Sequence, residues 1–257
     1  MKICKHPTTD TWITPLMTLA LSKGEIHIWS ANLLQPDDIV DQLHGELSED
    51  EKERAREYKY DRDRRRFIVS RGTLRRLLGR YLQEEPSRLE FTYGTHGRLE
   101  LRRKFLGQDV TFNLAHSEDL ALYAFTTGLS IGLDLEYVKE MPDADEVAAR
   151  FFSDRENAIL EVQVGRRRLE AFYRCWTLKE AYVKAVGAGM AFPLRRVEVS
   201  FTSGGARLLE VNGDRHEAAR WSMFTLEPAE GYVAAVAVNG MNYRFKQYSV
   251  DEKLLSG

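Results

Sequence analysis

The sequence predicts an α+β protein built from two similar halves. Two segments, residues 67–82 and 172–190, have the apolar spacing of long amphipathic helices, and each follows a charged segment. Several strand patterns accompany each helix, and the two sets join near residues 127–145. We therefore expect an N-terminal extension over residues 1–24, an N-terminal half over 25–127, a C-terminal half over 128–245 and a C-terminal tail over 246–257.

The composition indicates a globular protein in a reducing compartment. The 257 residues suffice for a sizeable core, and the net charge of -2 provides no overall field for nucleic acid or an anionic membrane. Two cysteines, Cys4 and Cys175, exclude a disulfide framework and a cysteine-rich metal site. No run approaches the roughly 20 apolar residues of a membrane span. We therefore expect a cytoplasmic protein.

The N-terminal half is expected to begin with an alternating strand at residues 25–30. Pro36 at a first helical turn opens a helix that runs to about Leu43. Ser48, followed three residues later by Glu51, is a capping-box pattern that starts the next helix. In the long helix, the side chains expected to face the core are Phe67, Leu74, Leu77, Leu78 and Leu82. Further strands are expected at residues 89–93, 98–101, 110–114 and 120–126, with turns at 94–97 and 115–119.

The C-terminal half is expected to open with a strand at residues 130–136. A helix at 144–150 follows a linker-like stretch at 139–145, and Ser153 caps another that runs to about Val164. The long helix ends in glycines, and its apolar face consists of Leu178, Ala181, Tyr182 and Ala185. Further strands are expected at residues 196–201, 206–211, 221–226 and 232–238.

Two carboxylates stand two residues apart in the strand at residues 130–136. Because side chains alternate along a strand, Asp134 and Glu136 point to one face. Like charges this close repel each other, and a bound cation relieves the repulsion. Oxygen ligands of this kind suit Mg²⁺, which combines few protein carboxylates with phosphate oxygens and water. On spacing alone a solvated strand end also explains the pair, so both interpretations stay open.

Trp176, Glu180 and Lys184 recur every four residues and share one face of the second long helix. Glu followed by Lys at this spacing is a common surface pair that contributes only about 0.3–0.5 kcal/mol. The tryptophan and the terminal glycines are unusual neighbours for a solvated face. The alternative is a site where the carboxylate meets a metal ion and the amine meets a phosphate.

His116 lies in Asn-Leu-Ala-His-Ser, residues 113–117, between two expected strands. A single histidine is often a structural hydrogen-bonding group. In a turn, beside a hydroxyl and backbone N–H groups, it can instead hold a phosphate. The residues alone leave both roles open.

The segment over residues 54–80 is rich in arginine. A charge run is usually a solvated face, and the interleaved acidic residues up to position 63 support that reading. Arg66, Arg71 and Arg75 lie beyond those acids, and guanidinium groups suit the forked recognition of phosphate. The sequence contains no recognisable nucleic-acid-binding motif, P-loop, dinucleotide fingerprint, Gly-X-Ser-X-Gly elbow or His-Glu-X-X-His.

Four segments, taken in order, resemble the 4′-phosphopantetheinyl transferases of the Sfp type, the larger pseudo-dimeric class. They are residues 113–117, Ile-Gly-Leu-Asp-Leu-Glu at 131–136, Phe-Phe-Ser-Asp-Arg-Glu at 151–156, and 172–190 with its core Trp-Thr-Leu-Lys-Glu-Ala-Tyr-Val-Lys. Upstream, residues 64–75 resemble the family's N-terminal basic helix, and Gly97-Arg98 resembles its Gly-Lys-Pro segment. The resemblance covers about residues 25–240. It implies a pseudo-dimeric fold with the active site between the halves.

The resemblance also implies a reaction. The family transfers the phosphopantetheine arm of coenzyme A to a serine of an apo acyl or peptidyl carrier protein, with Mg²⁺, and releases adenosine 3′,5′-bisphosphate. By motif, Asp134, Glu136 and Glu180 would hold the metal on the pyrophosphate. Glu180 would also accept the serine proton, directly or through water. Such a transfer depends on charge neutralisation and positioning, which a metal, lysine and arginines supply.

The remaining roles follow from the same motifs. Lys184 would neutralise the attacked phosphate and the leaving group, and His116 would contact a coenzyme A phosphate; with Glu180, these form the implied catalytic set. Arginines would hold the nucleotide 3′-phosphate and neighbouring groups. The implied coenzyme A contacts are Arg54, Arg71, Arg75, Arg98, Asn113, His116, Asp134 and Lys184.

Three positions depart from the family pattern. Ala115 stands where a serine usually precedes the histidine, which removes one hydroxyl contact. Leu99 stands where proline is common. Glu51 occupies the position of a basic residue expected three positions before Arg54, although Lys52 is adjacent. These departures bear on affinity and leave the reaction unchanged.

Two other functions stay open. A regulatory protein of the same fold would bind coenzyme A or a nucleotide without transfer, but the four charged residues Asp134, Glu136, Glu180 and Lys184 are all present. An RNA-binding module using residues 54–80 would bind RNA in a salt-sensitive manner. We expect a carrier protein partner, no nucleic acid and no membrane. An internally doubled chain has less need to dimerise, so we expect a monomer.

Overall fold

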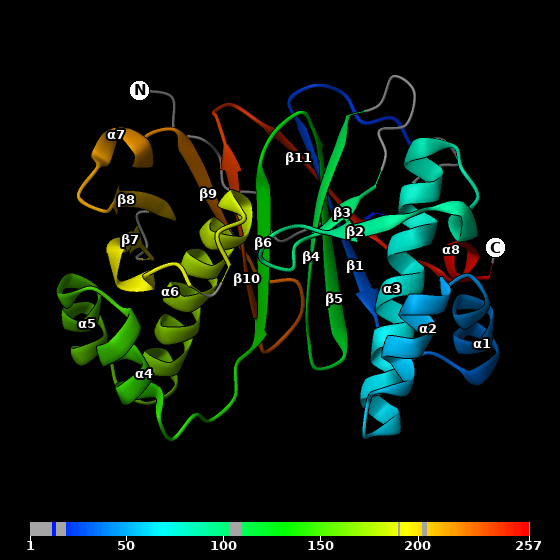
Figure 1. The fold of residues 1–257 in the computed structure, drawn as a ribbon. Helices are drawn as coiled ribbons and strands as arrows, with labels where there is room; N and C mark the ends of the chain where they lie inside the picture. Colours follow the sequence, from blue (N-terminus) through cyan, green and yellow to red (C-terminus); the bar gives the residue numbers. More distant parts are fainter. Residues whose placement is uncertain (1–11, 14–18, 103–108, 190, 202–204, 257) are drawn as a thin grey trace.

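The computed structural model describes residues 12–13, 19–102, 109–189, 191–201 and 205–256, which form an α+β fold (Figure 1). One order of elements occurs twice: a first strand, two short helices, a 22-residue helix, a hairpin and two antiparallel strands. In the N-terminal half these are β1 (Glu25–Asn32), α1 (Asp37–Gly45), α2 (Glu49–Arg56), α3 (Asp61–Leu82), β2 (Phe91–Tyr93), β3 (Leu99–Leu101), β4 (Val110–Ser117) and β5 (Leu120–Thr127). In the C-terminal half they are β6 (Ile131–Tyr137), α4 (Ala144–Phe151), α5 (Asp154–Glu161), α6 (Gly165–Val186), β7 (Val197–Ser200), β8 (Arg207–Val211), β9 (Trp221–Leu226) and β10 (Tyr232–Asn239), with the short helix α7 (Arg215–Ala218) before β9.

The two sheets repeat one pairing pattern. β1 pairs antiparallel with β5, which pairs with β4; β6 pairs antiparallel with β10, which pairs with β9. The helices α3 and α6 flank the two sheets, which lie next to each other in the middle of the molecule (Figure 1). The expected α+β fold with two similar halves is confirmed. Among the described helices, none combines the length and the apolar composition needed to cross a bilayer.

The last described elements of the chain join the N-terminal half. Residues 244–249 form β11 (Arg244–Ser249), which pairs in parallel with β1, and the short helix α8 (Glu252–Leu255) follows. We expected residues 246–257 to be a tail. Instead, β11 pairs with the edge of β1, and the apolar side chains of Leu254 and Leu255 in α8 are buried in the N-terminal core. In the expected extension, Ile13 pairs with Tyr248 of β11, while residues 1–11 and 14–18 lie outside the described part.

The strand β4 is longer than the sequence predicts. We expected a turn over residues 115–119, but Ala115, His116 and Ser117 pair with β5 in continuous register. Two residues, Glu118 and Asp119, then close the hairpin, and Glu118 takes a positive φ of 47°. Continued pairing with β5 gives hydrogen-bond partners to the backbone groups of residues 115–117. In the sequence, the polar side chains of this segment favour a turn instead. His116 therefore lies on a strand.

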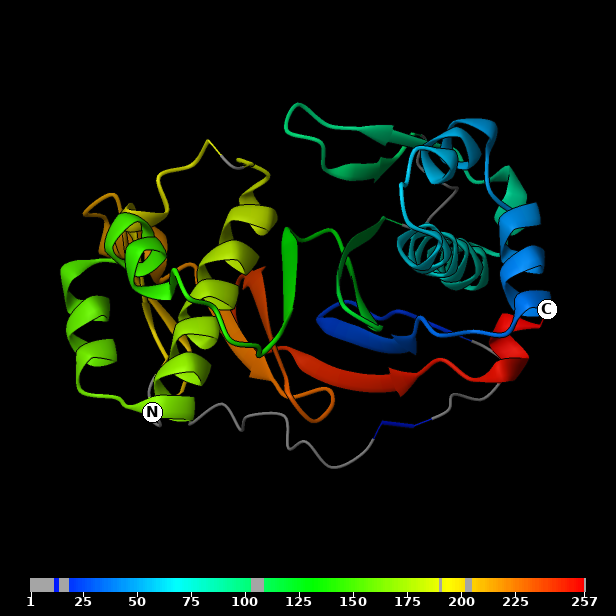
Figure 2. The same ribbon diagram turned by 90° about the horizontal axis from the view of Figure 1, so that it is seen from below.

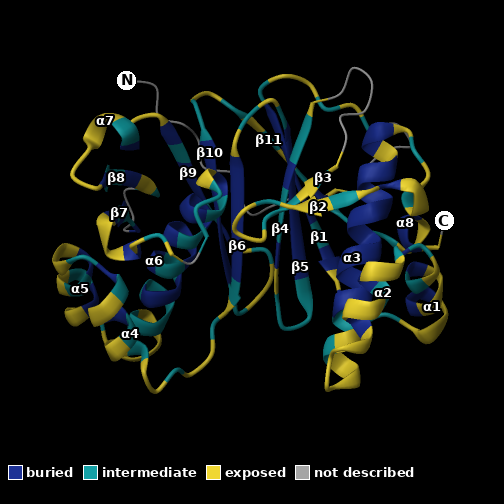
Figure 3. Ribbon diagram, in the orientation of Figure 1, coloured by how far each residue is buried: buried dark blue, intermediate teal, exposed yellow. Residues whose placement is uncertain are grey.

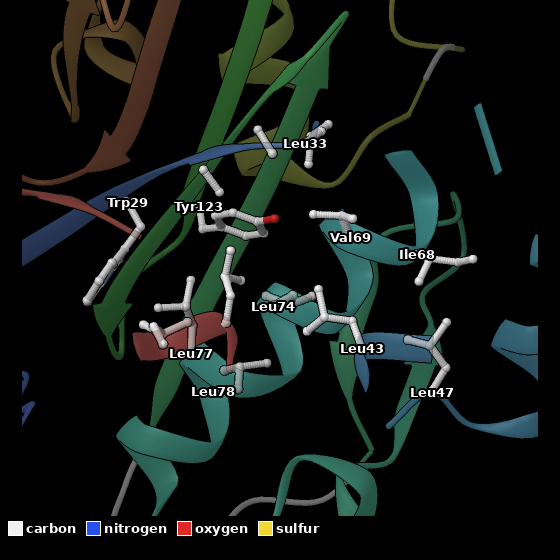
Figure 4. Packing of buried hydrophobic residues seen from close by; sticks show 14 of the residues in the cluster. Trp29, Leu33, Leu43, Leu47, Ile68, Val69, Leu74, Leu77, Leu78 and Tyr123 are labelled. Carbon is white, nitrogen blue, oxygen red and sulfur yellow. The ribbon is translucent and has the colours of Figure 1, made fainter. Parts of the chain in front are cut away.

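The long helices pack through the residues that the sequence predicts. Figure 4 shows Leu74, Leu77 and Leu78 of α3 against Trp29 of β1 and Tyr123 of β5, and all five are buried. On α6 the predicted apolar face is also buried. The helix begins at Gly165, two turns before the predicted start, and ends before Gly187, whose φ is +68°. A third apolar cluster joins strands of both sheets, so the buried residues run continuously through the centre of the molecule (Figure 3).

In each half a buried glutamate joins the second short helix to the long helix. The capping box expected at Ser48 and the cap expected at Ser153 are both present, the latter also as a capping box, so α2 and α5 begin where predicted. The glutamate of each box also reaches the long helix: Glu51 accepts from Arg75 at 2.7 Å, and Glu156 lies 2.6 Å from Lys179. All of these charged side chains are at most 2% exposed. The pairing of each charge lets it lie inside the fold.

His27 is a buried histidine on β1, with 1% of its surface exposed. Its Nδ1 lies 2.7 Å from the Tyr81 hydroxyl, and its Nε2 lies 3.4 Å from Glu25 Oε2. Burial, reinforced by Lys246 and opposed by Glu25, lowers the pKa of His27 to about 4. His27 therefore binds a proton less readily in the folded protein than in the unfolded chain, where its pKa is about 6.5.

The stability should consequently fall as the pH falls from about 6.5 towards 4, because protonation of His27 favours the unfolded chain in that window. Between pH 7 and pH 5 this group should remove roughly 2 kcal/mol from the free energy of unfolding. Urea unfolding of the wild type and of His27→Gln at both pH values measures the effect. The variant should lack that part of the pH dependence, and an identical loss in both proteins would contradict the assignment.

Candidate active site

A cavity of about 330 Å³ lies between the two halves. Its wall on one side consists of α2, α3, the hairpin β2–β3 and β4; on the other side it consists of α6 and the loop that follows. Figure 2 shows the hairpin β2–β3 reaching from the N-terminal half towards the C-terminal end of α6. The predicted site residues in the cavity wall are Arg54, Arg71, Arg98, Asn113, Glu180 and Lys184.

Gly132 lets α6 lie directly on β6. A Cβ atom at this position would stand 2.0 Å from the Ala181 carbonyl oxygen and 2.3 Å from the Ala185 backbone nitrogen. The backbone of the strand therefore touches the backbone of the helix, which only a residue without a side chain permits. This contact places Asp134 of β6 next to the charged face of α6.

Asp134 and Lys184 form an ion pair across that contact. The Lys184 Nζ lies 2.6 Å from Asp134 Oδ1, and Asp134 is 5% exposed. Burial opposes the charge of the ammonium group, but Asp134, Glu180 and Glu136 outweigh it and raise the pKa of Lys184. Within the described part of the chain, the second oxygen of Asp134 is buried without a hydrogen-bond partner. A buried, unpartnered carboxylate oxygen is suited to a further cation or donor.

Glu136 and Glu180 belong to the same electrostatic cluster. Burial and then repulsion from Asp134 raise the pKa of Glu136 to about 7, although Ser117 Oγ donates to it at 3.2 Å. Burial and Asp134 also raise the pKa of Glu180. The charges of three carboxylates and one lysine are thus coupled, and the carboxylates are in excess.

This donor set fits a hard divalent cation such as Mg²⁺. It consists of carboxylate oxygens, one of them buried and unpartnered, and added positive charge would relieve their repulsion. Over the described ranges, no group of three or more His, Cys, Asp or Glu side chains already has the mutual geometry of a metal site. In this structure Lys184 supplies the positive charge, so the metal assignment of Asp134, Glu136 and Glu180 stays a prediction.

Arg54 and Arg71 present positive charge to the cavity. Arg71 is 7% exposed, stands between the rings of Phe67 and Phe91 and lies 3.6 Å from Glu51. Burial lowers its pKa, and its Nη1 has no partner among the described residues. Arg54 is exposed and donates to the Tyr93 hydroxyl at 3.0 Å. Both guanidinium groups are therefore placed to meet an anion.

The structure does not bring Arg75 to the cavity. Its Nε donates to Glu51, and its Nη1 donates to the carbonyl oxygens of Pro86 and Leu89 at 2.8 and 2.9 Å. It lies on α3 one turn after Arg71, but it contacts residues in the segment 86–91 and is completely buried. Its partners make it part of the frame that holds Glu51.

Asn113 and Arg98 join the two halves. The Oδ1 atom of Asn113 on β4 accepts from the backbone nitrogen of Leu133 on β6 at 2.8 Å. Arg98 donates to three carbonyl groups of the C-terminal half. Both residues thus combine a place in the cavity wall with a contact across it.

His116 lies further along β4, with its side chain exposed. Partial burial by the surrounding protein, together with Lys184, Arg66 and Arg71, lowers its pKa. Its predicted contact with coenzyme A phosphate stays a prediction.

Three residues of the site were missed by the sequence reasoning. Ser117 orients Glu136, Tyr93 binds Arg54, and Gly132 sets the distance between β6 and α6. Ser117 and Gly132 lie inside segments already singled out, so the strand alternation and a glycine in a buried strand were available signals. Tyr93 carries no local signal, because its partner comes from another element.

A known phosphopantetheinyl transferase is similar to this chain over most of its length. Residues 130–237 match the model of the 4′-phosphopantetheinyl transferase superfamily. The chain is 38% identical to the 4′-phosphopantetheinyl transferase HetI of Nostoc sp. over 236 residues, which cover 92% of this chain and 97% of HetI. It is 30% identical to a phosphopantetheinyl transferase of Thraustochytrium sp., covering 67% and 64% of the two chains. It is 27% identical to the 4′-phosphopantetheinyl transferase Sfp of Bacillus subtilis, covering 74% and 81%.

The match to HetI extends over both halves, and the family model covers the strand β6 and the helix α6 that carry the charged cluster. The chain therefore belongs to the 4′-phosphopantetheinyl transferase superfamily, a family of enzymes.

Proposed function

We propose that this protein transfers the 4′-phosphopantetheine arm of coenzyme A to a serine of an apo acyl or peptidyl carrier protein and releases adenosine 3′,5′-bisphosphate. The observation that carries the proposal is the cluster of Asp134, Glu136, Glu180 and Lys184 beside a cavity with two available arginines. A pyrophosphate needs positive charge at its oxygens, and the attacking serine needs a proton acceptor. The cleft offers both within one helical turn of α6.

In the proposed reaction the serine oxygen attacks the phosphorus that bears the pantetheine arm. A new P–O bond forms to serine, and the bond to the adenosine 3′,5′-bisphosphate leaving group breaks. Glu180 takes the serine proton, directly or through water; its raised pKa suits proton transfer near neutral pH. Lys184 balances charge on the attacked phosphate and the leaving group.

Mg²⁺ is part of this proposal. Asp134, Glu136 and Glu180 would hold it, and when bound it would polarise the pyrophosphate oxygens. Arg54 and Arg71 would hold the nucleotide end of coenzyme A, because both line the cavity, Arg54 is exposed and Arg71 has a donor without a partner among the described residues. Asn113 and His116 would contact the same co-substrate. We further propose that the protein acts as a monomer, because one chain supplies both walls of the cavity. We also propose that it is cytoplasmic, because a chain with only two cysteines suits a reducing compartment.

The direct test is mass spectrometry of an apo carrier protein incubated with the enzyme, coenzyme A and MgCl₂. We expect a gain equal to the phosphopantetheine arm on the carrier serine, and loss of that gain when EDTA removes the metal. A carrier whose serine is replaced by alanine is the matched control. No gain with acyl and peptidyl carriers alike would sink the transferase proposal.

The same samples separate the two rival functions. A non-catalytic regulator would bind coenzyme A in a calorimeter while leaving every carrier unmodified. An RNA-binding module would bind RNA tightly, with an affinity that falls steeply with salt and that coenzyme A does not change. Transfer without such RNA binding supports the enzyme.

A further inference from the structure

Arg98 makes an unusual set of contacts for a residue expected to hold a phosphate. Its Nη1 donates to the carbonyl oxygens of Lys184 at 3.0 Å and Ala185 at 3.1 Å, and its Nη2 donates to that of Ile131 at 3.2 Å. The first two acceptors lie in the last turn of α6, and the third lies at the start of β6. Arg98 itself comes from the turn between β2 and β3 in the other half.

The acceptors explain why a guanidinium group suits this place. The last carbonyls of a helix lack partners within the helix and form the negative end of its dipole. A planar cation with donors on several nitrogens can bind the helix carbonyls through one nitrogen and the strand carbonyl through another, in a fixed geometry that an ammonium group does not provide. Arg98 is half-buried, so these contacts are only partly screened by water.

The backbone around Arg98 supports the same contact. A Cβ atom on Gly189 would stand 2.6 Å from His96 Cβ, so the tip of the hairpin packs tightly against the loop after α6. Gly187 and Gly189 both have positive φ, a conformation that glycine adopts readily and that ends the helix before this loop. The hairpin tip and the C-terminal end of α6 therefore contact each other beside the cavity. We call this contact between residues 96–98 and 184–189 the clasp.

The clasp acts on the helix that carries the charged cluster. Lys184 offers its carbonyl oxygen to Arg98 and its ammonium group to Asp134, and Glu180 lies one turn before it. Gly132 sets how closely α6 approaches β6, and Arg98 holds the end of α6 towards the N-terminal half. We propose that Arg98 is a positioning residue, which fixes Lys184 and Glu180 for the transfer reaction by holding the last turn of α6. The inference rests on the proposed function for its kinetic consequences.

Arg54 provides the comparison. It lines the same cavity but is exposed, and its hydrogen bond goes to the Tyr93 hydroxyl rather than to α6. A residue that holds coenzyme A should affect KM for coenzyme A, whereas a residue that positions the reacting groups should affect kcat. Substitution of Arg98 is thus expected to lower kcat, whereas substitution of Arg54 is expected to raise KM for coenzyme A.

The test measures kcat and KM for coenzyme A with one apo carrier for the wild type, Arg98→Ala, Arg98→Lys and Arg54→Ala. Arg98→Ala should lower kcat about 10- to 100-fold and change KM by less than about threefold, since small displacements of reacting groups are costly. Arg98→Lys keeps the charge at the helix end and should recover part of kcat. Arg54→Ala should instead raise KM for coenzyme A.

Hydrogen exchange gives a readout that needs no activity. The amides of Gly187 and Ala188 bond to the carbonyls of Lys184 and Val183, so they report whether the helix end is held. Their exchange should accelerate in Arg98→Ala and stay as in the wild type in Arg54→Ala. If Arg98→Ala does not fold, Arg98→Lys serves for both measurements.

A raised KM with unchanged kcat and unchanged exchange in the Arg98 variants would overturn the proposal and make Arg98 a phosphate-binding residue. If the wild type itself modifies no carrier, the proposed function fails, while the exchange of residues 187–188 still decides whether Arg98 holds the helix.

Discussion

Replacing Glu180 with glutamine is expected to abolish most of the transfer while leaving the fold intact. The substitution keeps the shape of the side chain but removes the proton acceptor, and positioned general bases typically contribute 10²- to 10⁴-fold, so kcat should fall by about that range. Stability should stay the same or rise slightly, because Glu180 is a partly buried carboxylate repelled by Asp134. Rates of carrier modification and urea unfolding curves measure the two effects.

Two comparisons sharpen this experiment. Glu170→Gln changes a carboxylate on the same helix that pairs with Arg166 at i,i+4, and it should leave the rate unchanged. A titration with MgCl₂ separates the roles of Glu180: if the residue served the metal alone, high Mg²⁺ would restore the rate of Glu180→Gln. Full activity of the variant at ordinary Mg²⁺ would remove Glu180 from the mechanism.

Replacing Gly132 with alanine is expected to damage both stability and activity. The new methyl group would lie 2.0 Å from the Ala181 carbonyl oxygen, which is backbone and cannot rotate away. The helix α6 must then retreat by about 1 Å, with a loss of roughly 3 kcal/mol, near the upper end of what overpacking usually costs. The retreat also separates Lys184 from Asp134, so transfer should fall at least about tenfold.

The control for this variant is Gly45→Ala. Gly45 ends α1 at the surface, and an added Cβ would have no atom within 4 Å. Thermal unfolding and carrier modification of the two variants therefore compare the same chemical change with and without a clash. Similar stability of Gly132→Ala and Gly45→Ala would show that α6 adapts, and the close contact with β6 would then have no role in placing the site.

The local elements were largely predictable because their signals are local. Alternation at residues 131–136 places Asp134 and Glu136 in one strand, and the four-residue spacing places Glu180 and Lys184 on one helical face. The capping box at Ser48 and the cap at Ser153 mark helix starts that the structure confirms. By contrast, the strand β11 was missed, because residues 244–249 are mixed in polarity and gain their pairing only from the distant β1.

The roles of the arginines cannot be predicted from local sequence patterns. Arg71 and Arg75 have the same residue type, one turn apart on one helix, and the sequence assigns them one role. In the structure Arg71 lines the cavity with one nitrogen that has no partner among the described residues, whereas Arg75 donates hydrogen bonds to Glu51 and to two backbone carbonyls. Glu51 stands where the family pattern has a basic residue, and in this structure it is the buried partner of both arginines.

The sequence by itself determined the fold class, the superfamily and the identity of the charged residues, because periodicity and motif spacing act over a few residues. The tertiary structure alone decided which of those residues meet. Asp134 and Lys184 are 50 positions apart, and Gly132 brings them to 2.6 Å by allowing two backbones to touch. Whether an arginine faces ligand, carboxylate or helix end depends on the donors and acceptors that distant elements place around it, and that is a property of packing which no local spacing encodes.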